Sequence, residues 1–278
     1  MHPKLFHSLI FLEPMMQVER PSKAGRPNPA LWSSTREDTW ASREQAENDL
    51  RENPFWRRWD SRAYNQYVKY GLRSCPTALY PDASTTAVTL ATTKAQEAWS
   101  YLRFNSAPTS DRNSVDIDRF VNADLARVPK DGDLNSPENM FVAPWPCIAF
   151  VYLPYVRPSV LYVFGEKSHI NVPDRRKDKL QRTGEALGGS GGLDKGRVRQ
   201  EIIRKGSHMV PLEKVHDTAR ILASWLESQM ELYKAEVEFW TRQYDSQKSE
   251  RDGLALSSMW MDFVNGPADI KRPRRSKM

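Results

Sequence analysis

The chain has 278 residues, 39% of them hydrophobic and 27% charged, a composition typical of a globular protein with one large domain or two smaller ones. Its two cysteines, Cys75 and Cys147, form neither a disulfide framework nor a metal-binding spacing, which favours a reducing compartment. No apolar run reaches the roughly 20 residues that a membrane helix needs, so we expect no transmembrane segment.

The net charge is +6, and the basic residues are scattered apart from two clusters, residues 175 to 179 and residues 271 to 275. Neither cluster alternates with aromatic side chains, as a surface that binds single-stranded nucleic acid does. We interpret the first cluster as a solvated loop and expect no nucleic-acid partner. A nuclear protein that binds nucleic acid through its basic tail remains an alternative for the second.

Residues 5 to 12 form a nearly continuous apolar run, which predicts a buried parallel strand. Pro14 ends it, because proline has no N–H to donate to a sheet. Glu13 is therefore expected at the carboxyl end of a strand, where its simplest role is a surface carboxylate at a turn. Residues 15 to 36 are polar, contain three prolines and lack a period, which indicates an excursion out of the core.

The next hundred residues have a mainly helical pattern. Ser42 and Gln45 fit a capping box at the start of a helix that ends near Asn53. Aromatic side chains between residues 55 and 70 are typical of the packing face of a lid, which can also cover an apolar substrate. Further expected elements are helices at residues 61 to 72 and 92 to 101, a short strand at 85 to 90, and loops with one or two short helices at 106 to 147.

Two more β-type runs follow, at residues 160 to 164 and 198 to 203. Pro211 suits the first turn of a helix, so His208 is expected on a strand-to-helix loop. Such loops present catalytic groups in α/β sheets, although an isolated histidine there is more often an ordinary polar residue. Apolar side chains every three or four residues from Val215 to Tyr244 predict one amphipathic helix, so long that we expect its distal half to break or pack elsewhere.

Several motifs in order resemble a group of fungal α/β-hydrolases that includes peroxisomal lipases and toxin-biosynthesis hydrolases. They are PSVLYVFGEKS at residues 158 to 168, GGSGG at 188 to 192 and GSHMVPLEK at 206 to 214. Upstream, residues 59 to 60, 70 to 73 and 88 to 90 are similar to the cap region of that group. The resemblance covers roughly residues 1 to 245.

The resemblance implies an α/β protein with a partial α/β-hydrolase fold, consisting of the C-terminal core strands and helix with a large, mainly helical cap insertion. The implied core comprises residues 1 to 19 and 153 to 245. Residues 20 to 152 form the cap, and residues 246 to 278 form a flexible tail.

In the resembled enzymes a serine attacks an acyl carbonyl, a histidine takes its proton and a carboxylate orients the histidine. The resemblance implies that His208 is the base. The usual position of the acid is occupied by Ser168, which leaves Glu13 as the first candidate, since some relatives carry the acid after the sixth strand, and Glu166 as the second. His169 and His216 are interpreted as structural or surface residues. No cofactor and no metal are implied.

The nucleophile is not apparent in the chain. Residues 188 to 192 satisfy Gly-x-Ser-x-Gly, but a nucleophile elbow needs a strand directly before the serine and a helix directly after it, and neither is predicted around Ser190. In the resembled fold the elbow would precede residue 1, so we expect the chain to be truncated and hydrolysis to need a longer form of the protein. With three recognisable core strands, one buried edge would stay unpaired.

The implied function is serine-type hydrolysis of an ester or related acyl bond in a small apolar substrate. An epoxide- or lactone-directed variant stays open because the nucleophile is not visible, and a non-catalytic hydrolase remnant that acts as an interaction protein is the alternative. The final tripeptide, Ser276, Lys277 and Met278, resembles the Ser-Lys-Leu peroxisomal address. We therefore predict recognition by the peroxisomal import receptor and a peroxisomal location, with the cytoplasm as the alternative.

Overall fold

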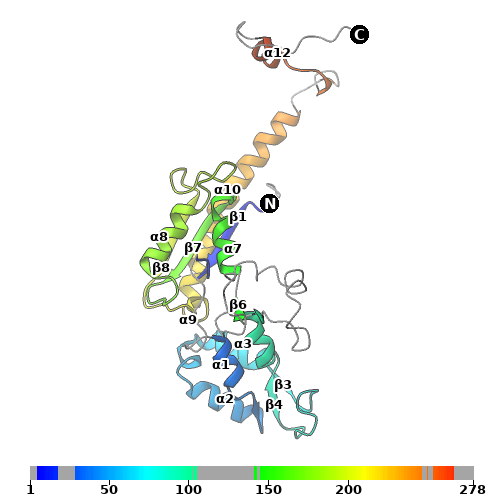
Figure 1. The fold of residues 1–278 in the computed structure, drawn as a ribbon, viewed down its shortest axis with the longest axis vertical. Helices are drawn as coiled ribbons and strands as arrows, with labels where there is room; N and C mark the ends of the chain where they lie inside the picture. Colours follow the sequence, from blue (N-terminus) through cyan, green and yellow to red (C-terminus); the bar gives the residue numbers. More distant parts are fainter. Residues whose placement is uncertain are drawn as a thin grey trace, which may run out of the picture. The chain divides into compact units, whose positions relative to one another are not determined.

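The core of the protein is a parallel sheet of three strands in the order β1-β7-β8 (Figure 1). Its strands are β1 (Ser8–Leu12), β7 (Ser159–Gly165) and β8 (Val198–Ile203). Ser8 lies opposite Ser159, and Val160 lies opposite Val198. The three predicted strands are therefore confirmed. The computed structural model describes residues 5–17, 29–101, 103–104, 141–142, 145–245, 249 and 253–265.

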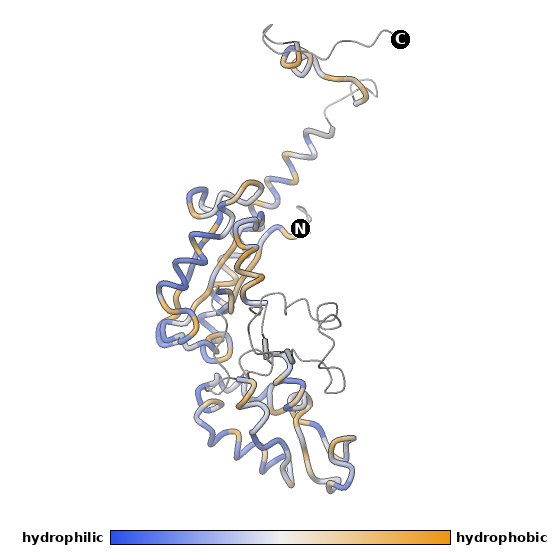
Figure 2. The backbone as a smooth tube through the Cα atoms, in the orientation of Figure 1, coloured by the Kyte–Doolittle hydropathy of each residue, from blue (hydrophilic) through white to orange (hydrophobic). Residues whose placement is uncertain are grey.

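The central strand β7 is buried on both faces, and Val160 through Phe164 are each at most 1% exposed. On one face it packs against α7 (Trp145–Tyr152) and α8 (Pro173–Arg182) through side chains such as Phe150 and Leu180. On the other face it packs against α10 (Val215–Asp245) through Ile221, Leu222 and Trp225. Figure 2 shows the hydrophobic strands between these helices. Coverage on both faces explains why the sequence of β7 is a continuous apolar run.

Helix α8 corrects the interpretation of residues 175 to 179 as a solvated loop. Figure 2 shows α8 as mainly hydrophilic, yet Arg176 is buried and Lys179 is 1% exposed. The Arg176 guanidinium donates to the carbonyl oxygens of Asn171 and Gly165 at 2.5 and 2.9 Å and lies 5.6 Å from the Phe164 ring centroid. Arg176 thus has backbone partners at and just after the end of β7, whereas Nζ of Lys179 donates to the carbonyl oxygen of Arg175 within the helix at 3.2 Å.

After β8 the chain forms a short helix, α9 (Val210–Glu213), and then α10. Pro211 lies in the first turn of α9, as predicted. Of the two outcomes expected for the distal half of the long helix, a break is wrong, because α10 is continuous over 31 residues and the interruption lies at Lys214. The distal half does belong to a separate compact unit, from Leu226 onwards. No proline or glycine occurs between Val215 and Asp245, so nothing in the sequence forces a kink.

The segment between β1 and β7 contains a second, smaller core. A short antiparallel sheet in the order β2-β4-β3 packs with α2 and α3 around Trp40, Trp56 and Tyr64. The aromatic side chains thus pack together, and the role of this segment as a lid stays a prediction. The bounds in chain order are α1 (Pro29–Thr35), β2 (Thr39–Trp40), α2 (Arg43–Glu52), η1 (Trp56–Arg58), α3 (Ser61–Gly71), β3 (Leu72–Ser74), β4 (Val88–Leu90), α4 (Lys94–Tyr101), β5 (Arg103–Phe104) and β6 (Phe141–Val142).

Local signals predicted part of this segment and missed part of it. The Ser42 side chain caps α2 by accepting from the N–H of Gln45 at 3.1 Å, and the Gln45 side chain accepts from the N–H of Ala41. Helix α1, by contrast, lies within the stretch expected to lack regular structure. Most of residues 106 to 147, the basic cluster at 271 to 275 and the tripeptide Ser276, Lys277 and Met278 lie outside the described residues.

The chain forms two compact units, Met1–Trp225 and Leu226–Met278. The second contains the distal part of α10 and a short helix, α12 (Ser258–Asn265). Glu13, His208 and the segment between β1 and β7 all belong to the first unit. Among the described residues, no helix is long and apolar enough to span a membrane. The predicted division into core, cap and tail stays a prediction.

Candidate active site

The carboxyl ends of the three parallel strands bring together residues that are far apart in the sequence. Glu13 directly follows β1, Gly165 ends β7, and His208 follows β8 by five residues. The N–H of Glu13 donates to the carbonyl oxygen of Val163 at 2.9 Å, which fixes its backbone against β7. Glu13 has a φ of 47°, a conformation that is uncommon for a residue other than glycine.

The Glu13 carboxylate is buried and accepts from four groups. Its Oε2 lies 3.0 Å from Nδ1 of His208 and accepts from Oγ of Ser168 at 2.6 Å and Nδ2 of Asn171 at 2.9 Å. Its Oε1 accepts from the N–H of Gly165 at 2.6 Å. Glu13 is 4% exposed, so these contacts replace the water that an ionised carboxylate needs.

Burial and hydrogen bonding act on Glu13 in opposite directions. Burial raises the pKa of the Glu13 carboxyl, whereas the hydrogen bonds from His208, Ser168, Asn171 and Gly165 lower it. The hydrogen bonds prevail, and the pKa lies below its ordinary value of 4.5. Glu13 is therefore a carboxylate at neutral pH and can orient an imidazole through Nδ1–H.

A glycine at the end of β7 allows the loop of His208 to come close. A Cβ atom at Gly165 would lie 2.3 Å from the carbonyl oxygen of Ser207 and 2.6 Å from that of Gly206. Both contacts are with backbone atoms, which cannot rotate away as a side chain could. Replacement of Gly165 by a larger residue would therefore push the His208 loop away from Glu13.

The His208 loop is held from its C-terminal side by Glu213. The Glu213 carboxylate accepts from the N–H of Ser207 at 2.8 Å and from its hydroxyl at 2.7 Å. Arg58, from η1, approaches the same carboxylate at 3.5 Å. His208 keeps a side-chain exposure of 29%, so its ring is held in place but remains accessible.

Of the two candidate acids, Glu13 is the one that contacts His208. The Glu166 carboxylate accepts from the N–H of Lys205 at 2.7 Å and so supports the start of the loop instead. The sequence did not single out Asn171, since an amide three residues past Ser168 gives no catalytic signal. His169 has a ring centroid 5.9 Å from that of His208, and burial, followed by the charge of His208, lowers its pKa.

Ser190 does not lie in a nucleophile elbow. No strand precedes it and no helix follows it, and its backbone N–H donates to the carbonyl oxygen of Val156 at 3.0 Å. Its hydroxyl accepts from the N–H of Gly192 at 3.2 Å. Within the described part of the chain, no cluster of three or more His, Cys, Asp or Glu side chains could hold a metal ion.

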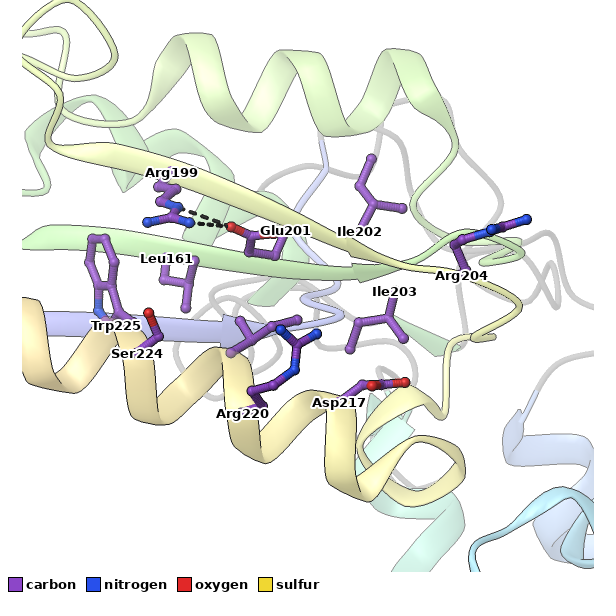
Figure 3. A pocket seen from close by; sticks show the side chains of 11 residues that line it. Leu161, Arg199, Glu201, Ile202, Ile203, Arg204, Asp217, Arg220, Ser224 and Trp225 are labelled. Carbon is purple, nitrogen blue, oxygen red and sulfur yellow. Dashed lines mark hydrogen bonds and ion pairs between the residues drawn. The ribbon is translucent and has the colours of Figure 1, made fainter.

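A pocket of about 410 Å³ lies between β8 and α10 (Figure 3). Its walls include Ile203 from β8 and Asp217 and Arg220 from α10, but neither Glu13 nor His208. This pocket is therefore separate from the candidate active site.

Comparisons with known proteins point to hydrolases. The chain is 31% identical over 280 residues to a type I acyl-CoA thioesterase, mpaH, of Penicillium roqueforti. The matched region covers 94% of this chain and 61% of the relative. It is 25% identical over 226 residues to the abhydrolase domain-containing protein AKT2 of Alternaria alternata, covering 81% of this chain and 75% of the relative. No family model matches. The chain thus spans about three fifths of the length of the thioesterase relative.

Among solved structures, the fold is similar to the peroxisomal α/β-hydrolase Lpx1 of Saccharomyces cerevisiae. The TM-score is 0.51 at 15% sequence identity, over 94% of this chain and 59% of that one. At this identity the similarity concerns the fold. It confirms the expected partial α/β-hydrolase architecture, with parallel core strands and a helical segment inserted between β1 and β7.

Proposed function

We infer from these similarities that the chain belongs to the fungal α/β-hydrolases, and we propose that Glu13 and His208 are the acid and the base of an enzyme that hydrolyses an acyl bond. The observation that carries the proposal is the 3.0 Å contact between Oε2 of Glu13 and Nδ1 of His208. An acid that follows β1 and a histidine that follows β8 lie at the same edge of the sheet, where this fold performs its chemistry.

In the proposed reaction, the Glu13 carboxylate accepts from Nδ1–H of His208 and so leaves the lone pair on Nε2. Nε2 takes the proton of a serine hydroxyl as the serine oxygen attacks the acyl carbon. The proton then passes to the leaving thiol or alcohol as its bond to the acyl carbon breaks. A water molecule, activated by the same histidine, releases the acid and restores the serine.

The serine is expected on a part of the protein outside the described residues. Strand β1 is the outer strand of the sheet beside β7, and all five of its residues are partly exposed although four of them are apolar. A further parallel strand beside β1 would cover these side chains and complete the hydrogen bonds of its free edge. We propose that such a strand leads to the nucleophile.

The proposed substrate is an apolar acyl thioester or ester. The relatives named acyl-CoA thioesterases favour the thioester. An acyl-bond hydrolase with this pair needs no cofactor, because the carboxylate, the imidazole and a serine supply all proton transfers.

Fluorophosphonate labelling tests the proposal and its nucleophile together. We expect the protein, as its own cell produces it, to hydrolyse acyl thioesters and to be labelled at one serine other than Ser190. A Ser190→Ala variant should be labelled to the same extent, because Ser190 does not lie in an elbow. Labelling lost in that variant would restore Ser190 as the nucleophile. Absence of both labelling and turnover would favour the non-catalytic remnant.

We also propose that the protein is imported into peroxisomes through Ser276, Lys277 and Met278. The support is the similarity of this tripeptide to the Ser-Lys-Leu address at the same terminal position. Deletion of the three residues should move an N-terminal fluorescent fusion from peroxisomes to the cytosol. Replacement of Met278 by Leu is the matched control and should keep the peroxisomal location. An unchanged location of the deletion variant would contradict the targeting role.

A further inference from the structure

We propose that the free edge of β8 is the two-fold interface of a homodimer, in which β8 pairs antiparallel with β8 of a second copy. Strand β8 is an outer strand of the sheet. Three of its six residues, Arg199, Gln200 and Ile202, are exposed, and Ile202 is 44% exposed. A regular edge strand without proline is a template for pairing with another strand.

The backbone directions in β8 show which groups are available. The N–H of Val160 donates to the carbonyl oxygen of Arg197 at 2.8 Å, and the N–H of Glu166 donates to that of Ile203 at 3.0 Å. The odd-numbered residues of β8 therefore direct their backbone groups at β7. Because this direction alternates along a strand, the even-numbered residues Val198, Gln200 and Ile202 direct theirs outwards. Within the described residues no strand lies on that side.

A two-fold axis at Gln200 makes this edge complementary to itself. Gln200 then pairs with Gln200 of the second copy, and Val198 pairs with Ile202 of the second copy. These are the residues with outward backbone groups, so they form the hydrogen-bonded pairs of an antiparallel ladder. At each end of the interface, the exposed side chain of one Ile202 lies beside the apolar side chain of Val198 of the other copy.

The charges on the strand favour the same axis. Arg199 donates to Glu201 of its own chain from Nε at 3.0 Å and from Nη2 at 2.6 Å, and Figure 3 shows both side chains on the face of β8 towards α10. The axis at Gln200 puts Arg199 opposite Glu201 of the second copy, twice. In an antiparallel ladder, Arg199 and Glu201 of the second copy would form a pair whose backbones exchange no hydrogen bonds. The side chains of such pairs approach most closely.

Neighbouring registers are disfavoured by the same charges. An axis moved to Arg199 would place two arginines directly opposite each other, and an axis moved to Glu201 would place two glutamates opposite each other. Like charges at such positions are destabilising. The alternation of Arg199 and Glu201 around Gln200 therefore selects one register for a second copy of this chain, a match that a strand of unrelated sequence would not reproduce.

A pair of cysteine variants tests the register. In Gln200→Cys the two Cα atoms would lie about 5.5 Å apart, within the range of a disulfide. In the matched control Ile202→Cys, each cysteine lies opposite Val198 of the other copy. The two cysteines are therefore four residues apart, about 14 Å along the strands. The natural cysteines, Cys75 and Cys147, are buried. Under mild oxidation we expect a covalent dimer for Gln200→Cys and little for Ile202→Cys. Equal cross-linking of both, or of neither, would overturn the proposal.

A charge exchange tests the pairing without a covalent bond. Arg199→Glu should raise the dissociation constant of the dimer about tenfold or more, since two favourable cross-strand pairs become repulsive. The double variant Arg199→Glu with Glu201→Arg should return the dissociation constant to near the wild-type value. Sedimentation velocity over a concentration series, with circular dichroism to check folding, measures both. A monomeric wild-type protein, an unaffected single variant or a failed restoration would each contradict the interface. Neither test needs turnover, so the result is independent of the proposed hydrolysis.

Discussion

Replacement of His208 by alanine is expected to abolish hydrolysis in every form of the protein that cleaves an acyl bond. Loss of the base removes the group that takes the serine proton, and in serine hydrolases such a loss lowers kcat by roughly 10⁴-fold or more. In this chain His208 is the histidine held by the Glu13 carboxylate, at 3.0 Å from Nδ1. Initial rates of thiol release from an acyl thioester measure the effect.

His216→Ala is the matched control for this experiment. His216 is exposed in the first turn of α10, where no role in the reaction is expected, so its replacement should leave the rate within about twofold of the wild type. Both variants should unfold at temperatures close to that of the wild type, because neither side chain is fully buried. Turnover by His208→Ala within tenfold of the wild type would remove the proposed base.

The parallel sheet could be predicted because its signal is local. Strands β1 and β7 are continuous apolar runs ended by Glu13 and Gly165, and such runs are characteristic of strands covered on both faces. The position of His208 followed from the strand before it and from Pro211 after it. The choice of Glu13 as the acid came from the family resemblance, because the hydrophobic pattern of the sequence does not identify a catalytic acid.

Helix α8 could not be predicted, because its stability depends on distant groups. Its sequence is strongly basic, so Arg176 and Lys179 suggested contact with solvent. In the fold, Arg176 donates to carbonyl oxygens at the end of β7, and burial lowers the pKa of Lys179 to about 8. Contacts of this kind join residues from different elements, and no local pattern reveals them.

The role of Ser168 was also hidden from the sequence. A serine at the usual position of the acid suggested that this position had lost its function. The structure places its hydroxyl 2.6 Å from Oε2 of Glu13, and the side-chain amide of Asn171 donates to the same oxygen. Both side chains thus hold the displaced carboxylate, and the spacing of three residues brings them onto one turn.

Glu13→Gln is expected to lower kcat by about 10⁴-fold while the protein still folds. The amide has the shape of the carboxylate, but it cannot stabilise an imidazolium and it favours the wrong tautomer of His208. In addition, its NH2 group must face one or more of the donors that now surround Glu13, namely Ser168, Asn171 and Gly165. The free energy of unfolding should therefore fall as well, by roughly 1 to 3 kcal/mol at neutral pH.

The pH dependence of stability separates this effect from a simple loss of packing. The pKa of Glu13 is lower in the folded protein than its ordinary value of 4.5, so the ionised carboxylate stabilises the fold above that pH. This contribution is lost as the pH falls through the folded pKa. In urea titrations, the difference between wild type and Glu13→Gln should therefore be largest near pH 7 and shrink below about pH 4.5. A difference that stays constant with pH would mean that the carboxylate is not held as described.

Glu166→Gln decides between the two candidate acids. Glu166 accepts one backbone N–H, from Lys205, and its amide can still accept that hydrogen bond through its oxygen. We therefore expect this variant to keep nearly full activity. If Glu166→Gln loses turnover and Glu13→Gln keeps it, Glu166 is the acid, and the 3.0 Å contact between Glu13 and His208 only supports the loop.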